Sequence, residues 1–235
     1  MQPAICTGMA QQQPSVQVHH LGTEKEPLVV IDGFSGRAEA LLEAGYRADY
    51  RPGGASYPGI RALADPGYLD LRRELMMQVM AQIFGVKRGI RCEASTYSLV
   101  TLAERELSPL QRIPHYDHSG EDLIAVMHYL LPPDSGGTAF YRHRRTGFEA
   151  ITPEREDAYG AATTEDLREF GEPPARYHFG DDERYEMIGA VEARVDRLIL
   201  YRGRQLHSGI IPAPDQLSDN PRDGRLTINM FLFGT

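Results

Sequence analysis

The order of apolar and polar residues predicts a chain that begins with helices and continues as a series of short strands. Residues 27–32 form a β-branched apolar run that ends at a turn, which is typical of a strand. Ser35 can cap a short helix that follows this strand. Residues 65–85 then place apolar side chains at helical spacing behind an Asp-Pro start, with Gly85 at the end. We expect this second helix to brace the outside of a sheet.

From residue 91 onward the hydrophobic pattern changes from a helical period to that of strands. The expected strands are short, apolar and separated by turns rich in glycine and proline; they cover residues 92–102, the stretch around 115–117, 122–131, 138–142, 187–191, 197–201 and 225–233. Residues 152–184 interrupt the series with helical signals, and we expect a partly helical insertion over one end of the β-structure. The sequence therefore predicts a mainly β fold with flanking α-helices, specifically a double-stranded β-helix (jelly roll) with N-terminal bracing helices.

The length and the polarity of the N-terminus predict the domain organisation. A chain of 235 residues can form one domain with a full core, which we expect to span residues 21–235. Residues 1–20 are polar and are expected to form a flexible N-terminal arm, without the basic start and apolar run of a signal peptide. No stretch is long and apolar enough to predict a membrane span.

Charge and cysteine usage narrow the expected partners. The net charge of −8 argues against nucleic acid, whose binders usually carry a basic excess. Cys6 and Cys92 show no paired spacing, which argues against a zinc ribbon or a disulfide framework and favours the cytoplasm. We therefore expect a small-molecule or peptidyl substrate, with no nucleic acid and no membrane as partner. The sequence makes no prediction of the oligomeric state.

One short stretch places metal-binding side chains at the spacing of a strand. Residues i and i+2 of an extended chain point to the same face, so His115 and Asp117 project together while Tyr116 faces away. A second strand that carries His207 beside them completes a set of two imidazoles and one carboxylate. This set is the facial triad that holds Fe(II) in non-haem oxygenases and leaves the opposite coordination positions open.

The order of these parts resembles the Fe(II)/2-oxoglutarate-dependent dioxygenase superfamily, and within it the prolyl-hydroxylase-like branch. The resemblance covers residues 92–233 and consists of an HxD motif on a strand, a Gly-Gly turn, a distal histidine and an R-x-T motif on the last strand. The superfamily binds its metal through HxD…H. The resemblance therefore implies that His115, Asp117 and His207 are the metal ligands and the catalytic residues.

The resemblance also implies which residues bind 2-oxoglutarate. In the superfamily the arginine after the distal histidine binds the far carboxylate, which matches Arg225, and a planar guanidinium can pair with both carboxylate oxygens. Thr227 points the same way along the strand and is expected to add a hydroxyl contact. Tyr129 falls where several relatives place a tyrosine that binds the same carboxylate. The implied cofactor is Fe(II), and the implied co-substrates are 2-oxoglutarate and O2.

The implied reaction is the oxidative decarboxylation of 2-oxoglutarate to succinate and CO2, coupled to hydroxylation or a related oxidation of a C–H bond. Asp117 favours hydroxylation over halogenation, because related halogenases replace this carboxylate with a small residue. Two alternatives remain open: a cupin-like metalloprotein that does not use 2-oxoglutarate, and a non-catalytic metal-binding sensing module. Arg225 distinguishes a 2-oxoglutarate oxygenase from the cupin-like alternative, since only an enzyme that uses 2-oxoglutarate needs this arginine for its co-substrate. Release of succinate distinguishes it from the sensing module.

The remaining histidines of the β region have ordinary structural explanations. Single histidines in sheets are more often hydrogen-bonded core or surface residues than ligands, and this interpretation covers His128, His143 and His178. The insertion of residues 152–184 is predicted to act as a lid that sets specificity, because loops at the mouth of a rigid barrel commonly do so.

Overall fold

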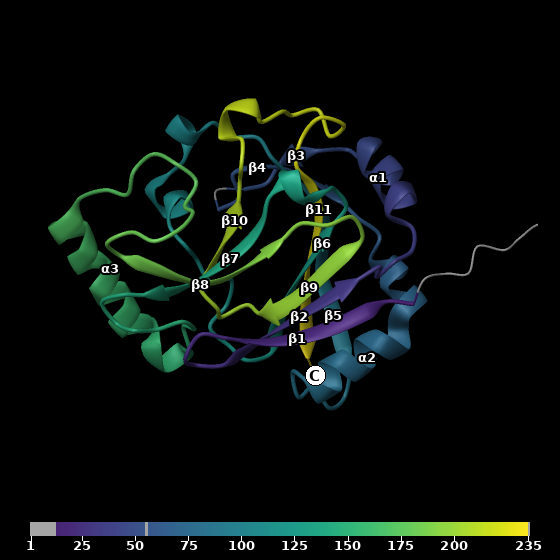
Figure 1. Ribbon diagram of the computed structural model, residues 1–235, viewed down its shortest axis with the longest axis horizontal. Helices are drawn as coiled ribbons and strands as arrows, with labels where there is room; N and C mark the ends of the chain where they lie inside the picture. The colour runs from purple at the N-terminus through teal and green to yellow at the C-terminus, as the bar shows by residue number, and fades with distance from the viewer. Residues whose placement is uncertain (1–12, 55, 235) are drawn as a thin grey trace, which may run out of the picture.

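The computed structural model describes residues 13–54 and 56–234 and shows two antiparallel β-sheets flanked by helices (Figure 1). Within these residues the larger sheet has eight strands, in the order β1 (Ser15–Leu21), β2 (Glu26–Asp32), β9 (Arg197–Arg202), β6 (Leu123–Tyr129), β11 (Leu226–Gly234), β5 (Ile90–Val100), β4 (Gly59–Leu63) and β3 (Arg51–Pro52). The smaller sheet has the order β10 (His207–Ile210), β7 (Gly137–His143) and β8 (Tyr185–Glu192).

From β5 onward the chain alternates between the two sheets in the order of a jelly roll. It leaves β5 in the larger sheet, meets the smaller sheet at an isolated bridge between His115 and His207, and returns to the larger sheet as β6. It then forms β7 and β8 in the smaller sheet, β9 in the larger, β10 in the smaller and β11 in the larger. The predicted jelly roll is confirmed, although the strand expected around residues 115–117 is reduced to that single bridge.

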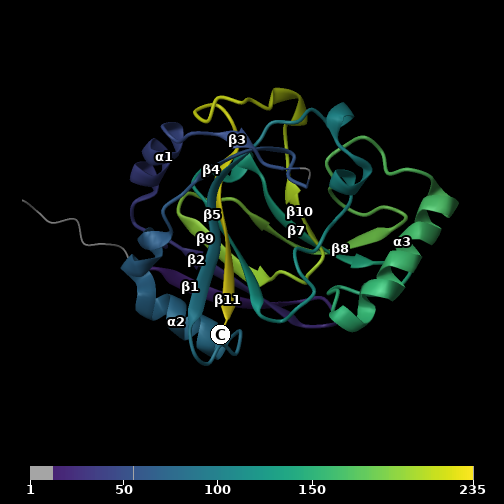
Figure 2. The same ribbon diagram turned by 180° about the vertical axis from the view of Figure 1, so that it is seen from behind.

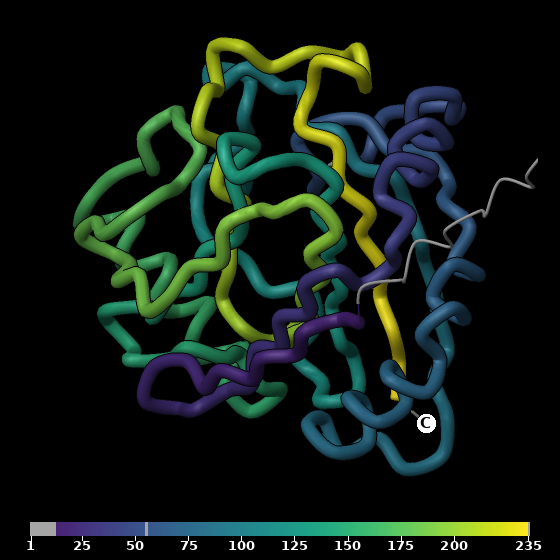
Figure 3. Tube along the Cα trace, turned by 45° about the vertical axis from the view of Figure 1, so that its right-hand side comes forward, coloured from purple at the N-terminus to yellow at the C-terminus, as the bar shows by residue number. Residues whose placement is uncertain are grey.

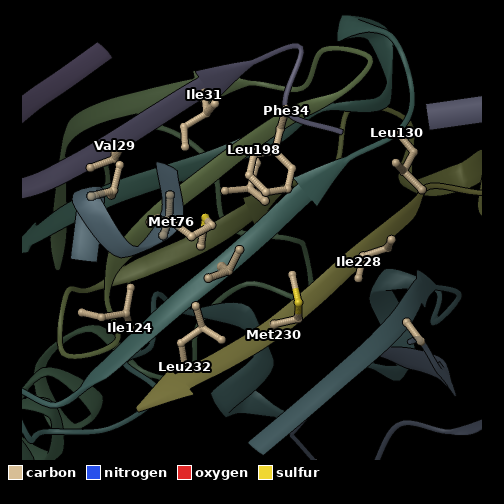
Figure 4. Packing of buried hydrophobic residues seen from close by; sticks show 14 of the residues in the cluster. Val29, Ile31, Phe34, Met76, Ile124, Leu130, Leu198, Ile228, Met230 and Leu232 are labelled. Atoms are coloured by element: carbon tan, nitrogen blue, oxygen red, sulfur yellow. The ribbon is translucent and has the colours of Figure 1, made fainter. Parts of the chain in front are cut away.

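The two faces of the larger sheet bury different sets of side chains, as the two-residue period of strands requires. On β11 one set, Leu226, Ile228, Met230 and Leu232, joins the large apolar cluster under the N-terminal helices (Figure 4). Side chains of the other set, including Asn229 and Phe231, line the space between the two sheets. The apolar cluster thus holds the sheet rigid from behind and leaves its inner face available for a site.

The helices lie on opposite sides of this β-structure. On one side are α1 (Ala38–Tyr46) and α2 (Arg73–Gln82), and on the other side is α3 (Glu156–Phe170) (Figure 2). Short 3-10 helices occupy Pro66–Arg72, Glu104–Glu106, Pro109–Arg112, Pro133–Ser135, Pro153–Arg155 and Pro214–Gln216. The expected bracing helices and the partly helical insertion are therefore both present. In the part of the chain that the structure describes, no helix combines the length and the apolarity that crossing a membrane would need.

The expected N-terminal arm of residues 1–20 needs correction. Residues 1–12 lie outside the described residues, but Ser15–Leu21 form β1 and pair with β2 along their whole length (Figure 3). The prediction of an arm is therefore wrong for residues 15–20. The side chains of these residues are exposed, so no buried apolar face marks the strand in the sequence. Backbone hydrogen bonds to β2 hold it in place.

Candidate metal centre

Backbone hydrogen bonds bring the three predicted ligands together from distant parts of the chain. The N–H of His115 donates to the carbonyl of His207 and the N–H of His207 donates to the carbonyl of His115, each over 2.9 Å. The N–H of Asp117 donates to the carbonyl of Gly203 over 2.7 Å. The main chain therefore fixes the placement of the three side chains, with the two imidazole ring centroids 4.4 Å apart.

The side chains of His115, Asp117 and His207 converge as predicted. Their potential ligand atoms all lie within 4.8 Å of one another. One carboxylate oxygen of Asp117 is 3.8 Å from Nε2 of His115, and the other is 3.7 Å from Nε2 of His207. These separations are too long for hydrogen bonds but bring three donor atoms around one point. Tyr116 turns away as expected, and its hydroxyl donates to Glu156 on α3.

The protonation states of both imidazoles suit metal binding. Nδ1 of His207 lies 2.9 Å from the carbonyl of Gln205, so Nδ1 carries the proton and Nε2 presents its lone pair. Burial lowers the pKa of His207 to about 4. The pKa of His115 is also lowered to about 4, because of desolvation and the neighbouring His207. Although the side chain of His115 is 54 % exposed, that exposed surface faces a walled cavity. Both rings are therefore neutral near pH 7.

One oxygen of the Asp117 carboxylate has the environment expected of a metal ligand. Its side chain is only 15 % exposed, and Oδ2 is buried without a hydrogen-bond partner among the described residues. Burial raises the pKa of this carboxyl group. A buried carboxylate oxygen without a partner is costly, and a cation held together with the two imidazole nitrogens would satisfy it. Two nitrogens and one carboxylate oxygen match the donor set of a non-haem Fe(II) site.

The three side chains open into a cavity of about 850 Å³ that also contains Arg225. Arg225 is 9 % exposed; its Nε donates to the carbonyl of Ser135 and its Nη2 to the carbonyl of Gly137, each over 2.9 Å. These bonds fix the guanidinium plane at the turn before β7. Nη1 makes no hydrogen bond to any described residue and is available to an anionic ligand in the cavity.

The other two predicted contacts to 2-oxoglutarate are buried behind the cavity wall. Neither Tyr129 nor Thr227 is among the lining residues. The hydroxyl of Tyr129 bonds that of Thr138 over 2.6 Å, and the hydroxyl of Thr227 donates to the side-chain oxygen of Asn229 over 2.9 Å. Thr138 and Asn229 do line the cavity. Thr138 and Asn229, which the sequence interpretation missed, therefore lie between these two hydroxyls and the cavity.

The remaining histidines near the site are separate from the triad. His128 is buried against Asp196, and His143 is buried against Asp166. These two have the structural roles expected from the sequence. His178 is different, because it lines the cavity and its buried Nε2 has no hydrogen-bond partner among the described residues.

Sequence interpretation also missed Arg61, which belongs to the same cavity. This residue lies on β4, just after a stretch rich in glycine and proline at residues 52–59. It lines the cavity. Its positive charge adds to the lowering of the pKa of His115 and opposes the rise that burial causes in the pKa of Asp117. No sequence motif indicates this arginine, because only the pairing of β4 with β5 brings it to the site.

Comparisons with known proteins give a family but no activity. Residues 12–232 match the model of a family of unknown function, DUF6445. No curated protein matches the chain.

Several solved structures are similar at low identity. HygX from Streptomyces hygroscopicus, with nickel, 2-oxoglutarate and hygromycin B bound, is 17 % identical, covering 88 % of this chain and 83 % of its own, with a TM-score of 0.46. An N-substituted L-amino acid dioxygenase from Burkholderia ambifaria AMMD, in complex with alpha-KG, is 13 % identical, covering 96 % of both chains, with a TM-score of 0.45. AviO1 from Streptomyces viridochromogenes Tue57 is 15 % identical, covering 94 % of this chain and 89 % of its own, with a TM-score of 0.44.

Proposed function

We propose that this chain, which belongs to the DUF6445 family of unknown function, is a non-haem iron oxygenase that uses 2-oxoglutarate and O2. The observation that carries the proposal is the convergence of two neutral imidazoles and a buried carboxylate oxygen without a partner at one cavity. Arg225 lines the same cavity with one guanidinium nitrogen free. A metal and a dicarboxylate co-substrate would satisfy both features.

Each residue has a defined task under this proposal. His115, Asp117 and His207 would hold Fe(II), and the bound iron would supply the activation of O2 that amino-acid side chains cannot provide. The His207–Gln205 hydrogen bond keeps Nε2 deprotonated toward the metal. Arg225 would pair with the far carboxylate of 2-oxoglutarate, with its plane held by the carbonyls of Ser135 and Gly137.

The proposed overall reaction is hydroxylation or a related C–H oxidation. For hydroxylation, 2-oxoglutarate, O2 and a substrate C–H bond give succinate, CO2 and an alcohol, with one oxygen atom entering succinate and the other the product. The substrate is proposed to be a small molecule or a peptide, and the compartment the cytoplasm. Membership of the prolyl-hydroxylase-like branch stays a prediction from the sequence motifs.

The proposal is tested by measuring succinate. Anaerobically reconstituted Fe(II) protein should release succinate and CO2 in equal amounts when O2 and 2-oxoglutarate are added together with a panel of amino acids, peptides and small metabolites. Substitution Asp117→Ala should lower this rate about a hundredfold or more, because the metal loses its only carboxylate ligand. His118→Ala is the matched control, since His118 is a neighbouring exposed histidine outside the triad.

Two results would contradict the proposal. Equal succinate release by the Asp117→Ala variant would separate the chemistry from the triad. Metal binding without succinate release from any mixture would favour the alternative of a cupin-like or sensing metalloprotein.

A further inference from the structure

A second arginine reaches the cavity through the register of the larger sheet. Arg61 on β4 is directly opposite Ser98 on β5, and Ser98 is opposite Thr227 on β11. Thr227 is in turn opposite Tyr129 on β6. Directly opposed residues on antiparallel strands project to the same face, so this row faces the space between the two sheets. The row continues to Arg51 on β3, and Arg61 is the member of the row that lines the cavity.

The guanidinium of Arg61 lacks the partners that other arginines of the protein have. Its carbon lies 4.0 Å from the centroid of the Tyr57 ring, a stacking contact that uses the face of the guanidinium and not its N–H donors. Its Nε is buried without a hydrogen-bond partner, and it forms no ion pair with any carboxylate of the described residues. By contrast, Arg142 and Arg145, on β7 and just after it, each pair with two or more carboxylates.

The charges around the cavity leave a positive excess for a ligand. Three arginines line it, Arg61, Arg184 and Arg225, together with two aspartates, Asp117 and Asp166. Asp166 is neutralised by Arg145, and Arg184 donates to the carbonyl of Gly171 at the end of α3. A divalent cation and the dianion of 2-oxoglutarate would cancel each other. The cavity would therefore remain positive with both bound. Of its three arginines, Arg61 is the one without a hydrogen bond or ion pair to a described residue.

The rest of the lining is largely apolar. Leu110, Ile113 and Ile211 line the cavity, and Leu110 is 77 % exposed. An exposed leucine at the cavity wall offers contact to an apolar ligand.

We propose that Arg61 is a specificity-determining residue that binds the carboxylate of the primary substrate, which carries that group on an apolar body. The inference rests on the proposed function, because it assigns 2-oxoglutarate to Arg225 and the metal to the triad. The fork of Arg61, stacked on Tyr57, would receive the carboxylate through paired charge-assisted hydrogen bonds. The apolar body would then contact the leucine and isoleucine side chains.

The test compares acids with their amides in the presence of saturating 2-oxoglutarate. The probes are phenylacetate, 3-phenylpropionate, hexanoate and N-acetylphenylalanine, each paired with its primary carboxamide. Binding is followed by ligand-observed NMR with Mn(II)-loaded protein, because relaxation by Mn(II) reports only ligands close to the metal. Saturating 2-oxoglutarate prevents the probes from binding at the metal or at Arg225.

Wild-type protein should bind at least one acid about tenfold or more tightly than its amide, as expected for a charge-assisted pair. The preference should vanish in Arg61→Gln and persist partly in Arg61→Lys, which keeps the charge but not the fork. Arg51→Gln is the matched control: Arg51 is directly opposite Arg61 on β3, is exposed and pairs with Asp49. This variant should keep the full preference.

The affinity for 2-oxoglutarate, measured in the same variants, separates the failure of this inference from failure of the proposed function. Arg61→Gln should bind 2-oxoglutarate as wild type does, which also shows that the variant is folded. The inference is overturned if no acid is preferred in wild type, if the preference survives Arg61→Gln, or if Arg61→Gln loses 2-oxoglutarate as Arg225→Gln does. If wild type binds no 2-oxoglutarate, the proposed function fails, and acid–amide binding without co-substrate still decides the role of Arg61.

Discussion

At the scale of single residues, burial at the triad sets the properties of the site. His207 is 5 % exposed and is surrounded by protein, including the ring of Tyr201 with its centroid 4.8 Å away. Burial of this kind keeps an imidazole neutral, so the free protein presents ligands that need no deprotonation before a metal binds. The stability of the metal-free protein therefore decreases as the pH falls, because its folded state must keep these histidines unprotonated.

This cost predicts how the stability of the metal-free protein depends on pH. His115 and His207 have pKa values of about 4 in the folded protein and about 6.5 in the unfolded chain. Between these two pH values the unfolded chain binds more protons than the folded protein. The free energy of unfolding therefore has its full value above about pH 6.5 and decreases as the pH drops toward 4. Urea denaturation of the chelator-treated protein at several pH values should show this loss.

The paired substitution His115→Gln with His207→Gln provides the control. It should reduce the pH dependence without abolishing it, because burial also lowers the pKa values of His128, His143 and His178. An identical pH dependence in the doubly substituted protein and in wild type would show that the triad histidines are not the groups responsible.

At the scale of elements, the buried carboxylate of Asp166 links α3 to the smaller sheet through hydrogen bonds. Asp166 accepts from Nε of Arg145 over 2.5 Å and lies 2.7 Å from Nε2 of His143, whose side chain is fully buried. The hydroxyls of Tyr159 on α3 and Tyr185 on β8 add a second buried contact of 3.0 Å. The ligands of the triad depend on other elements, namely β10 and the bridge to residue 115.

We therefore expect that weakening the contacts between α3 and the smaller sheet leaves the metal site intact. Asp166→Ala would leave His143 and Arg145 without their acceptor and should destabilise the protein by about 2–4 kcal/mol. Below the lowered melting temperature, the variant should still bind one Fe(II) per chain. Denaturation and metal stoichiometry measure the two effects, with the exposed Asp157→Ala on the same helix as the comparison. Loss of metal at unchanged stability would show that α3 supports the triad directly.

The elements also show where sequence reasoning succeeds and where it cannot. The HxD spacing and the distal histidine predicted the triad, because a two-residue period and local motifs are visible in the chain. Arg61, Thr138 and Asn229 were missed because their place at the cavity depends on which strands pair and in which register. The strand β1 was missed for a related reason, since an exposed edge strand held by its backbone leaves no hydrophobic pattern.

At the scale of the whole molecule, the jelly roll serves to gather groups that lie far apart in the chain. The apolar cluster beneath α1 and α2 makes the larger sheet a rigid wall, and the smaller sheet carries His207 opposite it. Between them, the triad, Arg225 and Arg61 share one cavity. Under the proposed function, 2-oxoglutarate would contact both the bound metal and Arg225, so we expect the binding of metal and co-substrate to be cooperative.

A site shared by metal and co-substrate is tested most simply by an anaerobic calorimetric titration of 2-oxoglutarate into the protein with and without Fe(II). We expect one equivalent of 2-oxoglutarate to bind per Fe(II)-loaded chain, with affinity at least about tenfold weaker without metal. A similar or greater loss of affinity is expected in Arg225→Gln. A site shared by metal and co-substrate is ruled out if the loaded wild type does not bind 2-oxoglutarate, or if neither metal removal nor Arg225→Gln changes its affinity.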